Sequence, residues 1–151
     1  DVSPHCPEFS DRYQGLVQAL QAAGLEVDPA LQIDAADSTE LVGQSAMRQL
    51  LARGARVDAV FAASDLLAIG AMRALEEAGL SVPGDVAVVG FDDIPMASFA
   101  SPPLTTVAQD TKRAGELLVE TLLHEIKNEP ATSVMLPARV VVRRSCGGTP
   151  G

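Results

Sequence analysis

One stretch constrains the fold more than any other, because residues 58–93 carry two apolar runs on either side of a helix-like segment. The runs, 59–63 and 86–91, are short and continuously apolar, which is typical of strands covered by helices on both faces. Between them, apolar residues recur at the spacing of one helical face until Gly79, a residue type that favours a helix end. This order predicts an α/β fold with a mainly parallel sheet and helices on both faces.

The alternation continues on the N-terminal side of this stretch. A first helix is expected from Ser10 to Gly24, and a short strand is expected at 31–33. The sequence Asp-Ser-Thr-Glu at 37–40 has the pattern of a capping box, which predicts that a further helix starts there and ends at Gly54. Each unit is therefore a helix, a glycine and an extended segment.

The C-terminal third is predicted to contain a strand, a helix and two extended segments. The two prolines at 102–103 lead into an apolar and threonine-rich strand at 104–107. Extended segments are expected at 134–137 and 139–144. The helix between them has an apolar stripe that is expected to be buried, formed by Ala114, Leu117, Leu118, Thr121, Leu122 and Ile126.

Composition excludes several classes of function for this chain. A net charge of −9 argues against a direct grip on nucleic acid, which requires clustered lysine and arginine. No apolar run approaches the ~20 residues of a membrane span. The two cysteines, Cys6 and Cys146, belong to no cluster with metal-ligand spacing and are interpreted as free thiols, and His5 beside Cys6 lacks partner ligands. No metal and no cofactor are therefore expected.

Polar residues follow the two central strands where a ligand site is expected. Asp92 and Asp93 come directly after the second strand, Ser64 follows the first, and Arg12 lies near the start of the first helix. In a parallel sheet these positions converge on the crevice at the carboxyl edge, although a solvated Arg12 is the alternative. Asp65 is interpreted as a structural carboxylate of a helix first turn, where Ser64 or Asp65 acts as the cap.

Three segments carry a resemblance to a known family. They are SDLLAIGA at 64–71, VVGFDD at 88–93 and PPLTTV at 102–107. In this order and at this spacing they resemble consecutive signatures of the lactose/galactose repressor (LacI/GalR) family, and the likeness extends from about Arg12 to Arg144. The resemblance implies a cytoplasmic transcription regulator with a two-lobed, periplasmic-binding-protein-like sensor. Such a sensor binds a small molecule, with carbohydrate as the expected class, between its lobes.

The same resemblance implies roles for the site residues. Asp92 and Arg12 are expected to be the principal contacts of the effector, with Ser64 and Gln109 as secondary contacts and Asp65 largely structural. A guanidinium is suited to this task because it presents a rigid fork of donors. The sequence departs from the family pattern at two positions. Ser38 stands where relatives often place an aromatic ring, and Ser64 stands where they commonly place asparagine.

The resemblance also bears on assembly. Residues 94–99 are too apolar for a free loop, and in the family this segment and the helix from Ser64 form part of a homodimer interface. Ile69, Met96 and Phe99 are the candidate interface residues, with simple core packing as the alternative.

The resemblance implies that residues 1–151 form part of an effector-binding and dimerisation domain, namely its second lobe with the last helix of the first. A helix-turn-helix domain is absent from this chain, so operator DNA is expected to bind the parent protein elsewhere. Two other classes stay open at this point. One is an extracytoplasmic sugar-binding protein, and the other is an enzyme or phosphoacceptor that uses Asp92 and Asp93 to hold Mg²⁺ or to divide acid and base roles.

Overall fold

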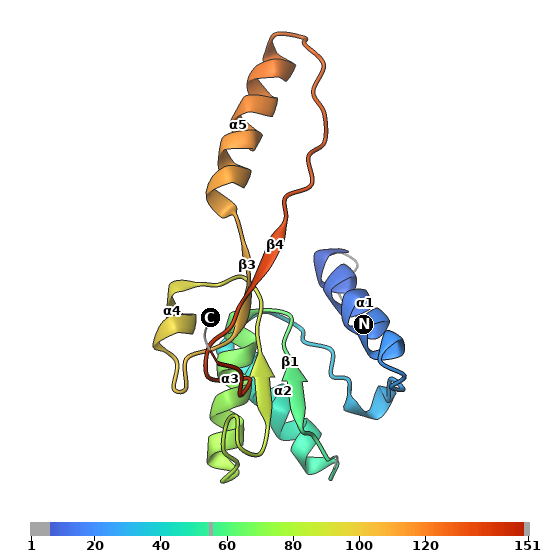
Figure 1. The fold of residues 1–151 in the computed structure, drawn as a ribbon, viewed down its shortest axis with the longest axis vertical. Helices are drawn as coiled ribbons and strands as arrows, with labels where there is room; N and C mark the ends of the chain where they lie inside the picture. The colour runs from blue at the N-terminus through green and yellow to red at the C-terminus, as the bar shows by residue number, and fades with distance from the viewer. Residues whose placement is uncertain (1–6, 55, 150–151) are drawn as a thin grey trace.

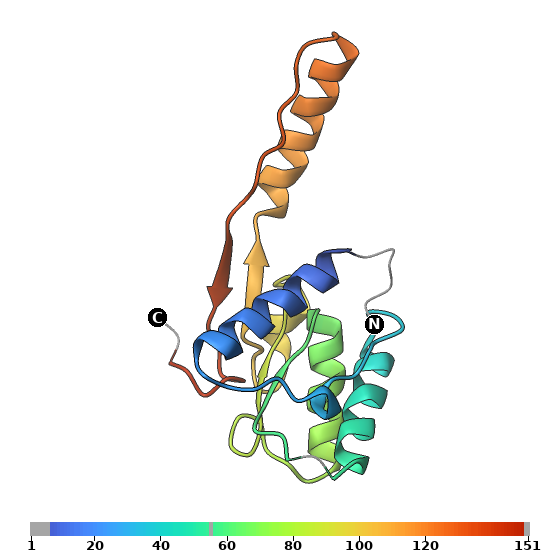
Figure 2. The ribbon, with the colours of Figure 1, turned by 90° about the vertical axis from the view of Figure 1, so that its right-hand side faces the viewer.

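The computed structural model describes residues 7–54 and 56–149. His5 and Cys6 lie outside these residues, and Cys146 carries a free thiol. The described chain forms a compact body and an arm that projects from it (Figure 1). A view turned by 90° shows the same arm standing clear of the body (Figure 2).

Three helices of the body end close to the predicted glycines, although the first begins at Pro7 and not at the predicted Ser10. Ser64 caps one by accepting the N–H of Leu67, as predicted. Another begins close to the predicted start at 37–40, but Thr39 is its cap and accepts the N–H of Val42, so Asp37 and Glu40 do not form the predicted capping box. All three are followed closely by a glycine with positive φ, such as Gly79 at 75°. Glycine adopts this conformation without the cost that a Cβ imposes. The helices are α1 (Pro7–Ala22), α2 (Glu40–Ala52) and α3 (Asp65–Glu77).

The strand predicted at 31–33 is wrong, because Leu31 ends a short 3-10 helix, η1 (Pro29–Leu31), and residues 32–33 belong to no strand. The Asp28 side chain accepts the N–H of Ala30 at 2.8 Å, and Pro29 has the fixed φ of a first helical residue. The Asp28 side chain therefore supplies a hydrogen-bond partner for the backbone N–H of Ala30, and no neighbouring strand is needed there.

The body is organised around the contact between α2 and α3. Gly43 of α2 lies against the backbone of Leu67, and Gly70 of α3 lies against the backbone of Glu40, so the two helices meet with no side chain between them. Their apolar faces form the core together with the strands. The buried core includes Met47, Leu50, Leu67, Ala68, Ala71, Met72, Ala74, Leu75, Val86, Val88, Ala97 and Leu104.

The strands form the parallel sheet expected from the sequence, with an antiparallel addition. In β1 (Ala59–Phe61) and β2 (Ala87–Val89), Val60 pairs with Val88 in parallel register. Parallel bridges from Val89 to Thr105 and from Asp92 to Ala108 connect β2 to the region of β3 (Thr106–Gln109). β3 then pairs antiparallel with β4 (Ala138–Val141). The α/β class and its parallel sheet are confirmed.

The helices lie on different sides of these strands. α2 and α3 lie side by side on one face of β1 and β2, and α1 lies beside the carboxyl ends of the strands (Figures 1 and 2). The segment after Asp93 contains the short helix α4 (Pro95–Phe99). No helix in the described ranges is long and apolar enough to cross a membrane.

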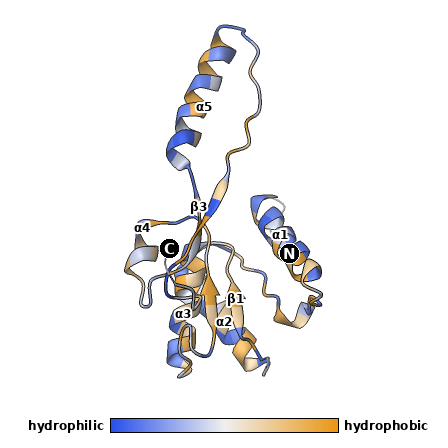
Figure 3. Ribbon diagram, in the orientation of Figure 1, coloured by the Kyte–Doolittle hydropathy of each residue, from blue (hydrophilic) through white to orange (hydrophobic). Residues whose placement is uncertain are grey.

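The buried stripe predicted for the last helix is wrong. α5 (Thr111–Ile126) begins at the cap Asp110 and has no buried residue, and Leu118, Leu122 and Ile126 are 71%, 58% and 67% exposed. β3 and β4 carry this helix away from the core, and apolar residues alternate with polar ones along the arm (Figure 3). Periodicity identifies an apolar face, but it does not specify what covers that face. Residues 134–137 on the returning side form no strand.

Candidate ligand-binding site

Arg12 of α1 connects the first helix to the carboxyl ends of β1 and β2. Its Nη1 donates to the carbonyl oxygen of Ala63 at 2.6 Å, and its Nη2 donates to Asp92 Oδ1 at 3.3 Å. The guanidinium lies over the ring of Phe91, 3.9 Å from the centroid, with Phe9 at 5.1 Å. Only 13% of the Arg12 side chain is exposed. Arg12 therefore lies at the carboxyl ends of the strands, as predicted.

Asp92 stands at the end of β2 in a backbone conformation that is rare for an L residue, with φ at 114°. Its Oδ1 accepts hydrogen bonds from Arg12 and from Gln109 Nε2, the latter at 3.0 Å. Within residues 7–54 and 56–149, no donor reaches the second oxygen, Oδ2. Burial raises the pKa of Asp92 above its usual value, while the charge of Arg12 opposes this rise. The carboxylate therefore keeps one oxygen open to accept a further hydrogen bond.

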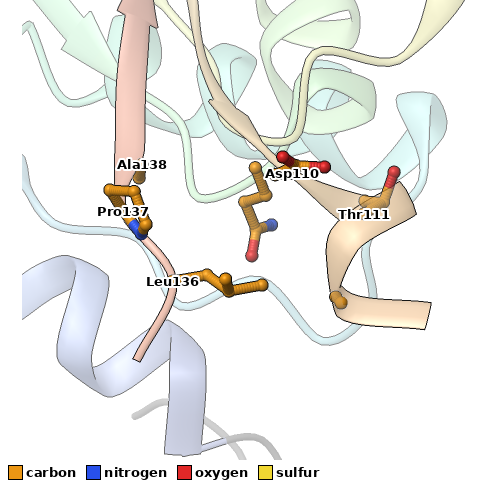
Figure 4. A pocket seen from close by; sticks show the side chains of 7 residues that line it. Asp110, Thr111, Leu136, Pro137 and Ala138 are labelled. Atoms are coloured by element: carbon orange, nitrogen blue, oxygen red, sulfur yellow. The ribbon is translucent and has the colours of Figure 1, made fainter. Parts of the chain in front are cut away.

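Gln109 at the end of β3 completes this cluster. Its side chain donates to Asp92 and also lines a cavity of about 110 Å³ between the start of α5 and the segment before β4. Figure 4 shows that Thr111 borders this cavity from α5, with Leu136 and Ala138 on the opposite strand side. The cluster thus adjoins a space formed where the body meets the arm.

Asp65 is buried and has protein partners for both oxygens. Oδ1 accepts the hydroxyl of Thr106 on β3, and Oδ2 accepts the N–H of Ile94 at 2.9 Å. Burial raises its pKa, and the hydrogen bond from Thr106 opposes this. Asp65 therefore ties α3, the segment before α4 and β3 together, which supports the structural role expected from its place in a first helical turn.

Ser64 is placed differently from the expectation. It is 3% exposed, it caps α3, and its hydroxyl contacts the hydroxyl of Ser38. The two positions at which the sequence departs from the family pattern therefore contact each other. Arg12 reaches the neighbouring Ala63 carbonyl and not the Ser64 side chain.

The two adjacent carboxylates Asp92 and Asp93 do not act as a pair. Asp92 faces Arg12, whereas Asp93 accepts a hydrogen bond from Arg143 Nη2 at 2.6 Å. The partner of Asp93 therefore lies 50 residues further along the chain. No group of three metal-ligating side chains occurs among the residues that the structure describes.

Sequence reasoning missed three participants. Phe91 precedes Asp92 at the strand end, so its position beside the site was a usable signal. The Ala63 carbonyl gave no signal in the sequence, because every residue carries a backbone carbonyl. Arg143 gave none either, since it is one of two consecutive arginines, and nothing in the sequence distinguishes it from Arg144.

The candidate dimer residues lie on α3 and α4. Ile69 is partly buried and lines a groove of about 450 Å³ with Met72 and Ala100. Met96 and Phe99 on α4 are 48% and 85% exposed. Core packing therefore explains the partial burial of Ile69, but it gives no role to the exposed side chain of Phe99.

Residues 2–146 match the family model described as the periplasmic binding protein-like domain. The HTH-type transcriptional regulator CelR of Thermobifida fusca is 44% identical over 137 residues, which is 89% of this chain and 40% of the relative. The ribose operon repressor of Escherichia coli K12 is 43% identical over 115 residues, which is 76% of this chain and 34% of the relative.

Solved structures agree with these relatives. A complex of the transcriptional regulator CelR with cellobiose is 44% identical, with a TM-score of 0.84, and covers 90% of this chain and 42% of that one. A LacI-family transcriptional regulator from Sanguibacter keddieii is 40% identical, with a TM-score of 0.85, covering 91% and 52%. The chain spans about two fifths of the length of the first curated relatives. It belongs to the periplasmic binding protein-like domain family and, within that family, to the LacI/GalR group of transcription regulators.

Proposed function

We propose that this chain is the effector-sensing and dimerising part of a cytoplasmic LacI-type regulator, a repressor that binds a small hydroxylated molecule. Residues 1–151 are assigned to the second lobe with the last helix of the first. The homodimeric parent protein binds operator DNA through a helix-turn-helix domain outside this chain, whose own charge of −9 is unsuited to DNA. The relatives support a regulator over a transport protein, since they are a transcription regulator and a repressor.

The observation that carries this proposal is the cluster of Arg12, Asp92 and Gln109. It brings a cation, a carboxylate and an amide together from α1, β2 and β3. A sugar hydroxyl both donates and accepts hydrogen bonds, so it matches the open Oδ2 of Asp92 and the guanidinium N–H groups. Asp92 and Arg12 are therefore the principal contacts, and Gln109 is secondary. Ser64 is left out of this set, because it is buried and its hydroxyl contacts Ser38.

Calorimetry with the two sugars named by the relatives tests the proposal. Cellobiose and D-ribose are titrated into the chain and into the full-length parent, and one of them, or another sugar of a mono- and disaccharide panel, is expected to release heat of binding. Asp92→Asn is expected to reduce this heat, because it removes the negative charge of the carboxylate that accepts hydrogen bonds from Arg12 and from the ligand. Asp58→Asn is the matched control, since Asp58 is an exposed carboxylate just before β1. Absence of binding to the parent across the panel would contradict a carbohydrate effector.

We infer homodimerisation through α3 and α4 from the exposed apolar side chains there. In light scattering at micromolar concentration, the chain is expected at twice its mass of 15.7 kDa. Phe99→Asp is expected to yield a monomer, because a charge on an apolar contact must lose its water. Leu41→Asp is the control, because Leu41 is similarly exposed, at 78%, but lies on α2. A monomeric parent chain would contradict the inference.

A further inference from the structure

We propose that Arg143 is a positioning residue, which holds the Asp92 carboxylate in its binding geometry by fixing the neighbouring Asp93. The inference rests on the proposed function of the Asp92 site. Arg143 itself does not touch that carboxylate, and it lies beyond β4 near the end of the chain. Its effect is therefore exerted through the backbone turn that contains both aspartates.

The turn requires an external restraint. Asp92 and Asp93 have φ values of 114° and 55°, a region that residues with a Cβ rarely adopt. Such conformations persist only where surrounding contacts determine them. On one side, the Asp92 N–H donates to the carbonyl of Val107 at 2.9 Å. On the other side, the shortest side-chain contact of the turn is the pair of Asp93 with Arg143 at 2.6 Å.

Arg143 is well suited to act as this restraint, because it is itself held at three points. Nη2 binds Asp93, Nη1 donates to the carbonyl of Leu104 at 2.8 Å, and the backbone N–H donates to Thr105 Oγ1 at 2.8 Å. The Arg143 and Asp93 side chains are only 20% and 22% exposed, so water screens the pair weakly. The guanidinium thus links the turn to the start of β3.

The segment that carries Arg143 is anchored to the sheet in turn. Ser145 is fully buried, and its hydroxyl donates to the carbonyl of Val88 at 2.6 Å and accepts the N–H of Thr105 at 2.8 Å. The position of Arg143 is therefore defined by β2 and by the residues before β3. Arg144 is exposed and makes no side-chain contact of this kind within the described residues.

The direct partners of Asp92 cannot replace this restraint when a ligand binds. Arg12 and Gln109 hold Oδ1 through side chains, which are the same groups that a sugar would engage. Arg143 acts from outside the cluster and stays in place. Loss of the Asp93 contact is expected to let the turn relax, which separates Asp92 from Arg12.

A cycle of unfolding measurements without any ligand tests the positioning role. Arg12→Met, Asp92→Asn and the double variant are compared in the parent background and in Arg143→Gln. In the parent, we expect the two changes to be non-additive by about threefold to tenfold in the unfolding equilibrium constant, and additive within about twofold in Arg143→Gln. The Arg144→Gln background is the matched control and is expected to keep the coupling. Coupling that survives in Arg143→Gln would overturn the proposal.

Ligand binding supplies a second measurement, with cellobiose as the probe. Arg143→Gln and Asp93→Asn are each expected to raise its Kd at least about tenfold, while Arg144→Gln stays within about twofold and Arg143→Lys recovers part of the affinity. Asp93→Asn matters because asparagine tolerates the positive φ, so this variant breaks the pair without straining the turn. An unchanged Kd in Arg143→Gln would overturn the proposal. If the parent does not bind cellobiose, that choice of effector fails, and the ligand-free coupling still decides the role of Arg143.

Discussion

Replacing Asp92 with alanine is expected to weaken effector binding about ten- to a hundredfold, because losing one buried polar partner costs ~1–3 kcal/mol. The substitution removes the open Oδ2 and also leaves Arg12 without its carboxylate. The Arg12 side chain is only 13% exposed, so water compensates this loss poorly. In the full-length regulator, the effector response should disappear while operator binding without effector survives.

Arg12→Ala is expected to have an effect of similar size, and it tests the cluster from its other side. The change removes two donors and the guanidinium face that lies over Phe91. Arg12→Lys should recover only part of the binding, because an ammonium lacks the planar fork and stacks less well. Calorimetry of folded variants is the measurement. If Asp92→Ala or Arg12→Ala bound the effector as tightly as the parent, that residue would have to be withdrawn from the site.

Gly70→Ala is expected to destabilise the folded chain by about 3 kcal/mol or more, at the upper end of the effects of overpacking. A Cβ at this position would overlap the carbonyl oxygen of Glu40 and would lie 2.7 Å from the backbone nitrogen of Gln44. Both obstacles are backbone atoms of α2, so no side chain can rotate away. The two helices would have to separate, which opens the core that they share.

The control for this prediction has the opposite sign. Gly115→Ala in α5 adds a Cβ that meets nothing within 4 Å, and alanine is favoured over glycine in a helix by about 1 kcal/mol. It should leave stability unchanged or raise it slightly. Urea unfolding of both variants separates the steric effect from helix propensity. A Gly70→Ala variant as stable as its parent would show that α2 and α3 can move apart at little cost.

Much of the fold follows from the sequence because the decisive interactions are local. Thr39 and Ser64 cap helices by binding N–H groups three residues ahead, and Gly79 ends a helix through its own backbone freedom. Such contacts need no tertiary partner, so they can be recognised in the chain. The same locality explains the error at 31–33, where a cap by Asp28 produced a 3-10 turn that an apolar pattern does not reveal.

The sequence predicts those parts of the candidate site that the order of the strands defines. The carboxyl ends of parallel strands meet at one edge, so Asp92 and the end of β1 had to lie close together. The contact of Gln109 with Asp92 follows from the addition of β3 beside β2. By contrast, the pairing of Ser64 with Ser38 was not predictable, because a hydroxyl can bind any nearby polar group.

Sequence alone therefore determined the alternation of helices and strands, the cap by Ser64 and the sheet edge at which the candidate ligand site lies. Only the tertiary structure decided which carboxylate pairs with which arginine. Arg12 and Asp92 are 80 residues apart, and Asp93 and Arg143 are 50 apart. Opposite charges attract irrespective of their identity, so the packing of β2, β3 and the C-terminal segment selects the partners. The exposure of α5 was decided in the same way, because an apolar face is buried only where another element reaches it.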